Sequence, residues 1–219
     1  MRFLMIFLLP LFLYGGEYFA KVEPFEAYTI ASKVSGLVTY TNEDVISKLA
    51  SDEIIVKIDD ELARVNYEVA RSTYDIKKRF YQKVKNLSTK SKIQKDNEKI
   101  IYLNAKQAYI RTKDDLEGRN IRAKNLYIED ILVKKGNFVM PGTPLIKAYD
   151  VSRAKIIIYV TKEDIEDIEN KKILVNGGDD FKLYKHFKIA DKVQISSYKL
   201  ILVGKIKGEF SHIAKVEIK

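Results

Sequence analysis

The stretch VKKGNFVMPGTPL, residues 133–145, decides the fold. Apolar residues and glycines alternate in it at every third position, in the order Val133, Gly136, Val139, Gly142, Leu145. This spacing fits neither an amphipathic helix nor a long alternating strand. It fits short strand ends joined by tight turns, because glycine adopts positive φ readily and Pro141-Gly142 is a strong turn dipeptide. The three apolar residues are therefore predicted to point into a small core.

A helical segment lies upstream of this stretch. Residues 60–117 contain neither Gly nor Pro, and helix formers dominate them. Ser91 and Gln94 have the spacing of a capping box, which predicts a new helix start there, and Gly118 is a typical stop. We expect two antiparallel helices of roughly 27 residues, about 40 Å long. Two apolar stripes at helical spacing are expected to be buried between them: Leu62, Val69, Ile76, Phe80, Val84 and Leu87 on the first helix, and Ile93, Ile100, Leu103 and Ile110 on the second.

The sequence on both sides of the helices is β-rich. Residues 17–59 and 119–150 are each too short to bury a core alone, so we expect them to pair into one domain with residues 60–118 inserted. Asp59 and Gly118 should then lie close in space. Residues 151–219 contain further strands and a short helix or turn, and are predicted to form a second β-domain.

The N-terminal residues indicate the compartment. Arg2 is followed by an apolar run over residues 3–13 and then by Gly15 and Gly16. The run is shorter than the ~20 residues that span a bilayer, so residues 1–16 are predicted to be a secretory signal peptide. An uncleaved inner-membrane anchor and a buried N-terminal element are the alternatives. The net charge of +9 suits nucleic acid, an anionic membrane or an acidic protein, and export argues against nucleic acid.

Catalytic and cofactor chemistry finds no support in the motifs. The chain has no cysteine, which excludes disulfides and thiolate sites. His186 and His212 have no partner at metal-ligand spacing, and no phosphate-binding loop or nucleophile motif occurs. We therefore expect no enzyme, no cofactor and no metal.

The order of elements resembles that of periplasmic adaptor proteins, the membrane-fusion or hemolysin-secretion-D-like family. VKKGNFVMPGTPLIKAYDVSRAKIIIYVTKEDI, residues 133–165, resembles the second half-motif of their lipoyl/biotinyl-like domain and the start of their β-barrel. AKVEPFEAYTIASKVSGLVTY, residues 20–40, resembles the first half-motif, with Gly36 in the characteristic position. The resemblance covers roughly residues 20–200. It implies an α+β chain: a split lipoyl/biotinyl-like β-sandwich with an inserted antiparallel coiled-coil hairpin, followed by a partial β-barrel-like domain.

The resemblance also implies a function. Such a protein would be an adaptor of a tripartite efflux or secretion system, linking an inner-membrane RND or ABC transporter to a TolC-like outer-membrane channel. It would act in the periplasm, beside the inner membrane, as a ring of copies that is typically hexameric. Lipoyl domains carry a modified lysine where this chain has its helical insertion, which argues against a cofactor-carrying role. A mass shift on a lysine would instead indicate a lipoyl carrier.

The end of the predicted hairpin is strongly basic. Residues 77–95 hold eight basic residues and no acidic one, which fits either a solvated helix end or a docking surface for an acidic partner. The predicted partner-binding residues are Lys78, Arg79, Lys83, Val84, Leu87, Ser88 and Ser91. The alternative function is an exported coiled-coil scaffold or adhesion protein, in which residues 25–59 and 119–150 would not pair.

Overall fold

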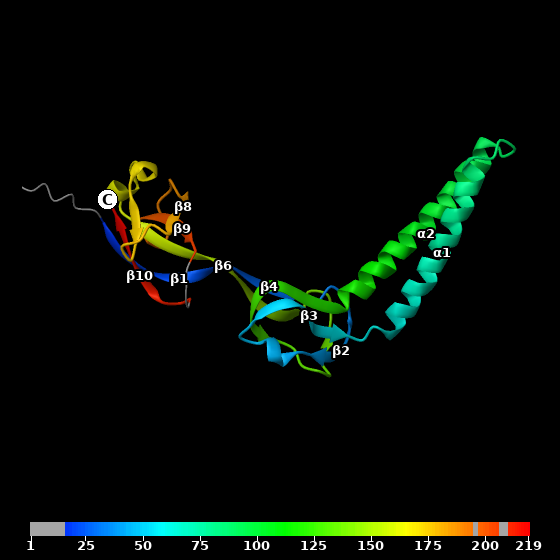
Figure 1. Cartoon of the computed structure of the whole chain (residues 1–219), viewed down its shortest axis with the longest axis horizontal. Helices are drawn as coiled ribbons and strands as arrows, with labels where there is room; N and C mark the ends of the chain where they lie inside the picture. Colours follow the sequence, from blue (N-terminus) through cyan, green and yellow to red (C-terminus); the bar gives the residue numbers. More distant parts are fainter. Residues whose placement is uncertain (1–15, 195–196, 206–209) are drawn as a thin grey trace, which may run out of the picture. The chain divides into compact units, whose positions relative to one another are not determined.

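The computed structural model describes residues 16–194, 197–205 and 210–219. The predicted signal peptide lies outside these residues, apart from Gly16. The described residues form two compact units (Figure 1): unit 1 combines residues 16–26 with those from 150 onward, and unit 2 is residues 27–149. The elements are β1 (Glu17–Ala31), β2 (Gly36–Thr41), η1 (Glu43–Val45), β3 (Leu49–Ile58), α1 (Glu61–Lys85), α2 (Lys92–Gly118), β4 (Asn120–Ile131), β5 (Phe138–Val139), β6 (Pro144–Val160), α3 (Lys162–Ile165), η2 (Ile168–Asn170), β7 (Ile173–Val175), β8 (Phe181–His186), β9 (Tyr198–Gly204) and β10 (Ile213–Ile218).

The β part of unit 2 joins segments from both sides of the helices. Strand β3 pairs antiparallel with β2 and with β4, β4 pairs with the first part of β6, and β5 pairs with β2. Their apolar side chains share one core. The predicted pairing of the two β segments is therefore confirmed, and the unpaired arrangement expected of a scaffold protein is not found.

The turns of the stretch 133–145 have the predicted conformation. Gly136 and Gly142 have φ of 94° and 91°. Each donates its backbone N–H to the upstream segment, Gly136 to the Val38 carbonyl at 2.9 Å and Gly142 to the Ser32 carbonyl at 2.8 Å. The turns thus tie together two segments that are about a hundred residues apart in sequence. The predicted core residues are buried: Val133, Val139 and Leu145.

Gly36 is needed for a different reason, the close approach of two strands. Its φ is not in the left-handed region, but a Cβ placed on it would lie 2.6 Å from Cγ2 of Ile58. Ile58 is fully buried in the same core. A side chain at position 36 would therefore overpack the junction of β2 and β3.

The two ends of the helical insertion meet at the β part. The backbone N–H of Ile58 donates to the Arg119 carbonyl at 2.8 Å, and Lys57 pairs with Asn120. The Arg119 guanidinium also donates to the Asp59 carbonyl. The prediction that Asp59 and Gly118 lie close in space is confirmed.

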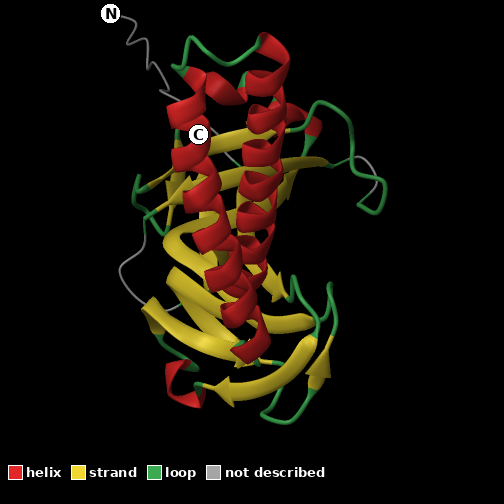
Figure 2. Ribbon diagram, turned by 90° about the vertical axis from the view of Figure 1, so that its right-hand side faces the viewer, coloured by secondary structure: helices red, strands yellow, loops and turns green. Residues whose placement is uncertain are grey.

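Helices α1 and α2 contact each other through stacked tyrosines. Tyr74 stacks on Tyr102 and Tyr109 with ring centroids 5.8 and 5.1 Å apart, while Tyr67 contacts Tyr109 and Tyr81 contacts Tyr102. The partners run in opposite order along the two helices, so the helices are antiparallel (Figure 2). On each helix the tyrosines recur at every seventh residue, the repeat that keeps one helix face toward a partner.

The predicted burial of the two apolar stripes is wrong. Apart from Val84, every residue of both stripes is exposed. The reason is angular: successive residues of a helix are about 100° apart, so Ile76 lies about 200° from Tyr74 around α1, and Leu103 lies about 100° from Tyr102 around α2. Once the tyrosines form the contact, the aliphatic residues face outward.

Unit 1 is an antiparallel β structure with its own core. The first part of β1 pairs with β10, with Glu17 opposite Glu217 and Lys21 opposite Ile213, and β10 pairs with β7. The second part of β6 pairs with β9, which pairs with β8. The apolar faces of these strands form a second core. Residues 17–26, expected to belong to the split domain, contribute to this unit.

Candidate interaction surface on α1 and α2

The outward faces of α1 and α2 carry apolar residues that no other element of the described chain covers. We name two surfaces: the outer α1 stripe is Leu62, Val69, Ile76 and Phe80, and the outer α2 stripe is Ile93, Ile100, Leu103 and Ile110. Their exposed fractions range from 45% to 73%. Several members recur at seven-residue spacing, like the tyrosines on the buried face. An apolar seam of this kind, left in water, marks an interaction surface.

A groove follows the outer α2 stripe. It has a volume of about 450 Å³ and is lined by Leu103, Lys106, Gln107, Ile110, Arg111 and Asp114. The apolar floor formed by Leu103 and Ile110 is therefore flanked by charged side chains. This combination suits the side chains of another amphipathic helix, with apolar residues at the centre and charged residues at the rim.

The charges differ between the two ends of the helical pair. At the start of α1, Asp60 accepts from Arg64 at 2.9 Å and lies 3.3 Å from the Lys57 ammonium. Burial raises the pKa of Asp60, but the hydrogen bonds from Arg64 and Lys57 outweigh it and hold the pKa below its usual value. At the end of α2, Asp115 pairs with Arg119 at 3.2 Å. The base thus pairs its charges, whereas residues 77–95 carry only cations.

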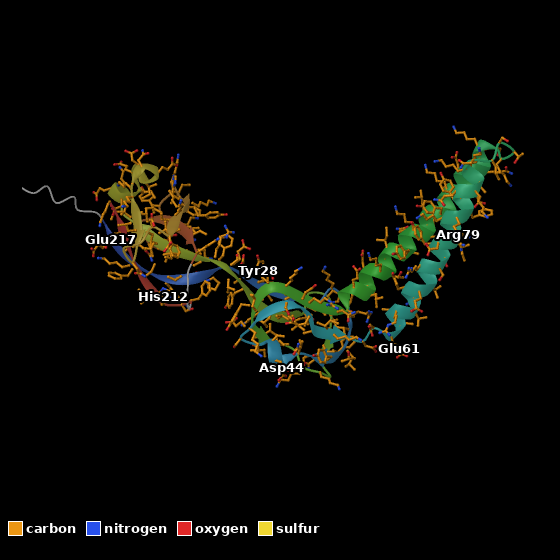
Figure 3. The ribbon with its side chains drawn as sticks, in the orientation of Figure 1. Tyr28, Asp44, Glu61, Arg79, His212 and Glu217 are labelled. Atoms are coloured by element: carbon orange, nitrogen blue, oxygen red, sulfur yellow. The ribbon has the colours of Figure 1, made fainter. Side chains whose placement is uncertain are left out.

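The predicted basic residues lie on the exposed surface of α1. In Figure 3, Glu61 marks the start of α1 and Arg79 lies toward its other end. The Arg79 guanidinium donates to the Asp75 carbonyl at 3.3 Å, and the Lys78 ammonium lies 5.6 Å from the centre of the Tyr74 ring. Lys83 is exposed one turn further along. These side chains give α1 a positive surface near its C-terminal end.

The other predicted residues divide into two kinds. Val84 is buried, so its side chain supports the end of the pair from within. Ser91 caps α2: its hydroxyl accepts from the Gln94 N–H at 3.3 Å, and its own N–H donates to the Gln94 side chain at 3.1 Å. The predicted capping box is confirmed. Leu87 and Ser88 are exposed in the connection between the helices.

Ser91→Ala should destabilise the start of α2 by about 1 kcal/mol, because it removes the hydroxyl that accepts the Gln94 N–H. Hydrogen exchange of the Gln94 and Lys95 amides should become several-fold faster. Ser88→Ala is the matched control, since Ser88 is exposed and belongs to no cap. Equal exchange rates in both variants would show that the capping box does not hold this end.

Sequence reasoning missed the tyrosine contact. The signal was present, since Tyr67, Tyr74 and Tyr81 follow one another at seven-residue intervals. A hydrogen bond with the Tyr67 side chain raises the pKa of Tyr109 above its usual value.

Comparisons with known proteins identify the fold. No family model and no curated protein sequence matches the chain. A putative efflux transporter from Bacteroides eggerthii matches with a TM-score of 0.70 at 15% identity, over 94% of this chain and 68% of that chain. A MacA–MexA chimera containing the Pseudomonas aeruginosa MexA α-hairpin domain matches with a TM-score of 0.68 at 17% identity, over 94% of this chain and 81% of that chain. The membrane fusion protein Spr0693 from Streptococcus pneumoniae matches with a TM-score of 0.61 at 11% identity, over 93% of this chain and 98% of that chain.

The chain therefore has the mixed α/β fold of membrane fusion and adaptor proteins, and the resemblance seen in the sequence is confirmed as a likeness of fold. Within the described part of the chain, no helix has the length and apolar character needed to cross a bilayer. The same residues contain no group of three or more acidic or histidine side chains arranged to hold a metal ion.

Proposed function

We propose that this protein is a periplasmic adaptor subunit of a tripartite efflux or secretion system. In this role α1 and α2 form a coiled-coil hairpin, the β part of unit 2 is a split lipoyl-like domain, and unit 1 is a partial β-barrel. The tip of the hairpin contacts an outer-membrane channel, TolC-like in kind. Unit 1 contacts an inner-membrane transporter of the RND or ABC type. The protein works by assembly, without catalysis, and is exported through its N-terminal segment.

The observation that carries this proposal is the pair of helices inserted into a paired β-domain, with apolar outer stripes and a basic end. Burial of apolar surface is the main driving force of association, and the exposed stripes offer it to a neighbouring copy. Side-by-side contacts between copies, made by the outer α1 stripe of one and the outer α2 stripe of the next, would build a ring. The basic end would steer the ring toward an acidic channel mouth.

Transport in the native host tests the assembly. Ile76→Glu places a carboxylate in the outer α1 stripe without touching the tyrosine contact. Expressed in a gene-deletion strain, this variant should give at least tenfold less dye efflux or protein secretion than the wild-type gene. Gln82→Glu is the matched control, because Gln82 is exposed on another face of α1, and it should restore transport. Full transport by Ile76→Glu would remove the stripe from the mechanism.

Cross-linking tests the channel contact. The chain has no cysteine, so Leu87→Cys provides a single attachment point in the connection between the helices. It should capture an outer-membrane protein in intact cells. Leu49→Cys, exposed on the β part of unit 2, should capture none. If Leu87→Cys yields no outer-membrane partner and deletion of the gene leaves efflux and secretion unchanged, the proposed function is wrong.

A further inference from the structure

The connection between β8 and β9 in unit 1 displays two strongly exposed aliphatic side chains. Ile189 and Val193 are 83% and 88% exposed. They lie within residues 187–194, which we call the β8–β9 tip. Exposing whole aliphatic side chains in water brings no stability to unit 1.

The backbone of the β8–β9 tip is held by hydrogen bonds. At its base the Phe187 N–H donates to the Lys199 carbonyl at 3.0 Å, and further out the Asp191 N–H donates to the Ser197 carbonyl at 2.8 Å. The Asp191 carboxylate accepts from the backbone N–H groups of Gln194 and Val193, at 3.0 and 2.8 Å. The carboxylate is thus engaged by its own turn, and the turn presents the aliphatic residues outward.

A lysine directly precedes each aliphatic residue. Lys188 stands before Ile189 and Lys192 before Val193, and both lysines are exposed. An aliphatic side chain beside a long cationic one is the pattern of an interfacial segment, in which the apolar group enters the lipid and the ammonium reaches the phosphates.

Acidic side chains are also present, but they line the base. Glu166, Asp167 and Glu169 line a groove of about 390 Å³ together with His186 and Lys188. His186 lies 4.0 Å from the Glu169 carboxylate. The acids therefore face His186 and the groove, while Lys192 and the two aliphatic residues occupy the turn beyond it. Lys192 is the lysine of the tip that does not line this groove, and the Asp191 carboxylate before it is engaged by the N–H groups of the turn.

The β8–β9 tip lies at the same end of unit 1 as the start of β1. Tyr198, which begins β9, pairs with Val160. Thr161, the residue after Val160, donates its backbone N–H to the Tyr18 hydroxyl at 3.3 Å. Among the described residues, the most exposed aliphatic side chains thus lie at the same end of unit 1 as the start of β1.

We propose that the β8–β9 tip docks on an anionic lipid surface, inserting Ile189 and Val193 between headgroups while Lys192 contacts the phosphates. A lipid surface fits better than a protein partner, because the tip offers two protruding side chains rather than the roughly 800 Å² per partner of a stable protein interface. This contact does not depend on the proposed function, since it concerns unit 1 and lipid alone.

An environment-sensitive fluorophore tests the docking. The full chain, with Val193→Cys labelled at its single thiol, is added to vesicles of phosphatidylglycerol and phosphatidylcholine that contain a spin-labelled lipid. The emission should shift to shorter wavelength, and quenching should be several-fold stronger than for Ile213→Cys. Ile213 is the matched control, since it is 72% exposed in the same unit but lies at the opposite end of β10 from Glu217.

Three results separate the possibilities, and membrane attachment by the N-terminal segment cannot mimic them because the readout is local to the probe. Lys192→Gln should reduce quenching toward the level seen on pure phosphatidylcholine vesicles. Equal quenching at positions 193 and 213, or none at 193, would overturn the proposal. Quenching that appears only when the vesicles contain inner-membrane proteins would assign the tip to a protein partner and would also overturn it.

Discussion

Leu145→Ala should lower the free energy of unfolding of unit 2 by about 2 to 5 kcal/mol. Leu145 is fully buried in the core that joins the two β segments. It follows the Gly142 turn, so the surrounding backbone is fixed by the hydrogen bond from Gly142 to Ser32 and cannot easily collapse into the space left behind. The cost therefore includes both the lost burial and the cavity. Denaturant unfolding followed by circular dichroism measures it.

Leu49→Ala provides the matched control for Leu145→Ala. It makes the same chemical change in the same unit, but Leu49 is 57% exposed at the start of β3. Its effect should stay within about 0.5 kcal/mol, as for most surface substitutions. Comparable losses in the two variants would mean that the stretch 133–145 does not close a core with the upstream segment.

The turns of the split β-domain were predictable because they depend on local chemistry. Gly136 and Gly142 are among the few residues able to adopt positive φ without strain, and a Pro-Gly dipeptide fixes the turn type. The capping box of Ser91 and Gln94 is equally local. Such features require no knowledge of the partner segment, and the structure agrees with each of them.

The division into two units was not predictable in the same way. Strands β1 and β6 are long, and each contributes residues to both units. Whether residues 17–26 pair with β10 or with the split domain depends on a strand about two hundred residues away. No local turn signal encodes such a long-range pairing, so the sequence suggested the wrong partner for these residues.

The face of the helices that forms their contact was mispredicted for a physical reason. Each helix carries two periodic surfaces, one of tyrosines and one of aliphatic residues. Hydrophobicity alone ranks the aliphatic surface as the buried one. Stacked tyrosine rings, however, bury apolar area and gain the attraction between rings, and the tyrosines of both helices in these stacks are partly buried. The aliphatic surface is then left for other molecules.

Tyr74→Ala should destabilise the α1–α2 pair by roughly 2 to 3 kcal/mol. The substitution removes the buried part of a large, half-buried side chain and two ring contacts worth about 0.5 to 1.5 kcal/mol each. Ile76→Ala, two residues along the same helix, should change the stability of the monomer by less than about 0.5 kcal/mol. Tyr74→Phe should retain most of the stability, since the stack remains. Loss of helical circular dichroism on heating, measured on dilute protein, distinguishes the three variants.

The reverse order, with Ile76→Ala the more damaging, would mean that the aliphatic stripe holds the helices together after all and is not available to a neighbouring copy. The variants therefore test the helix contact and the availability of the outer surface in one measurement.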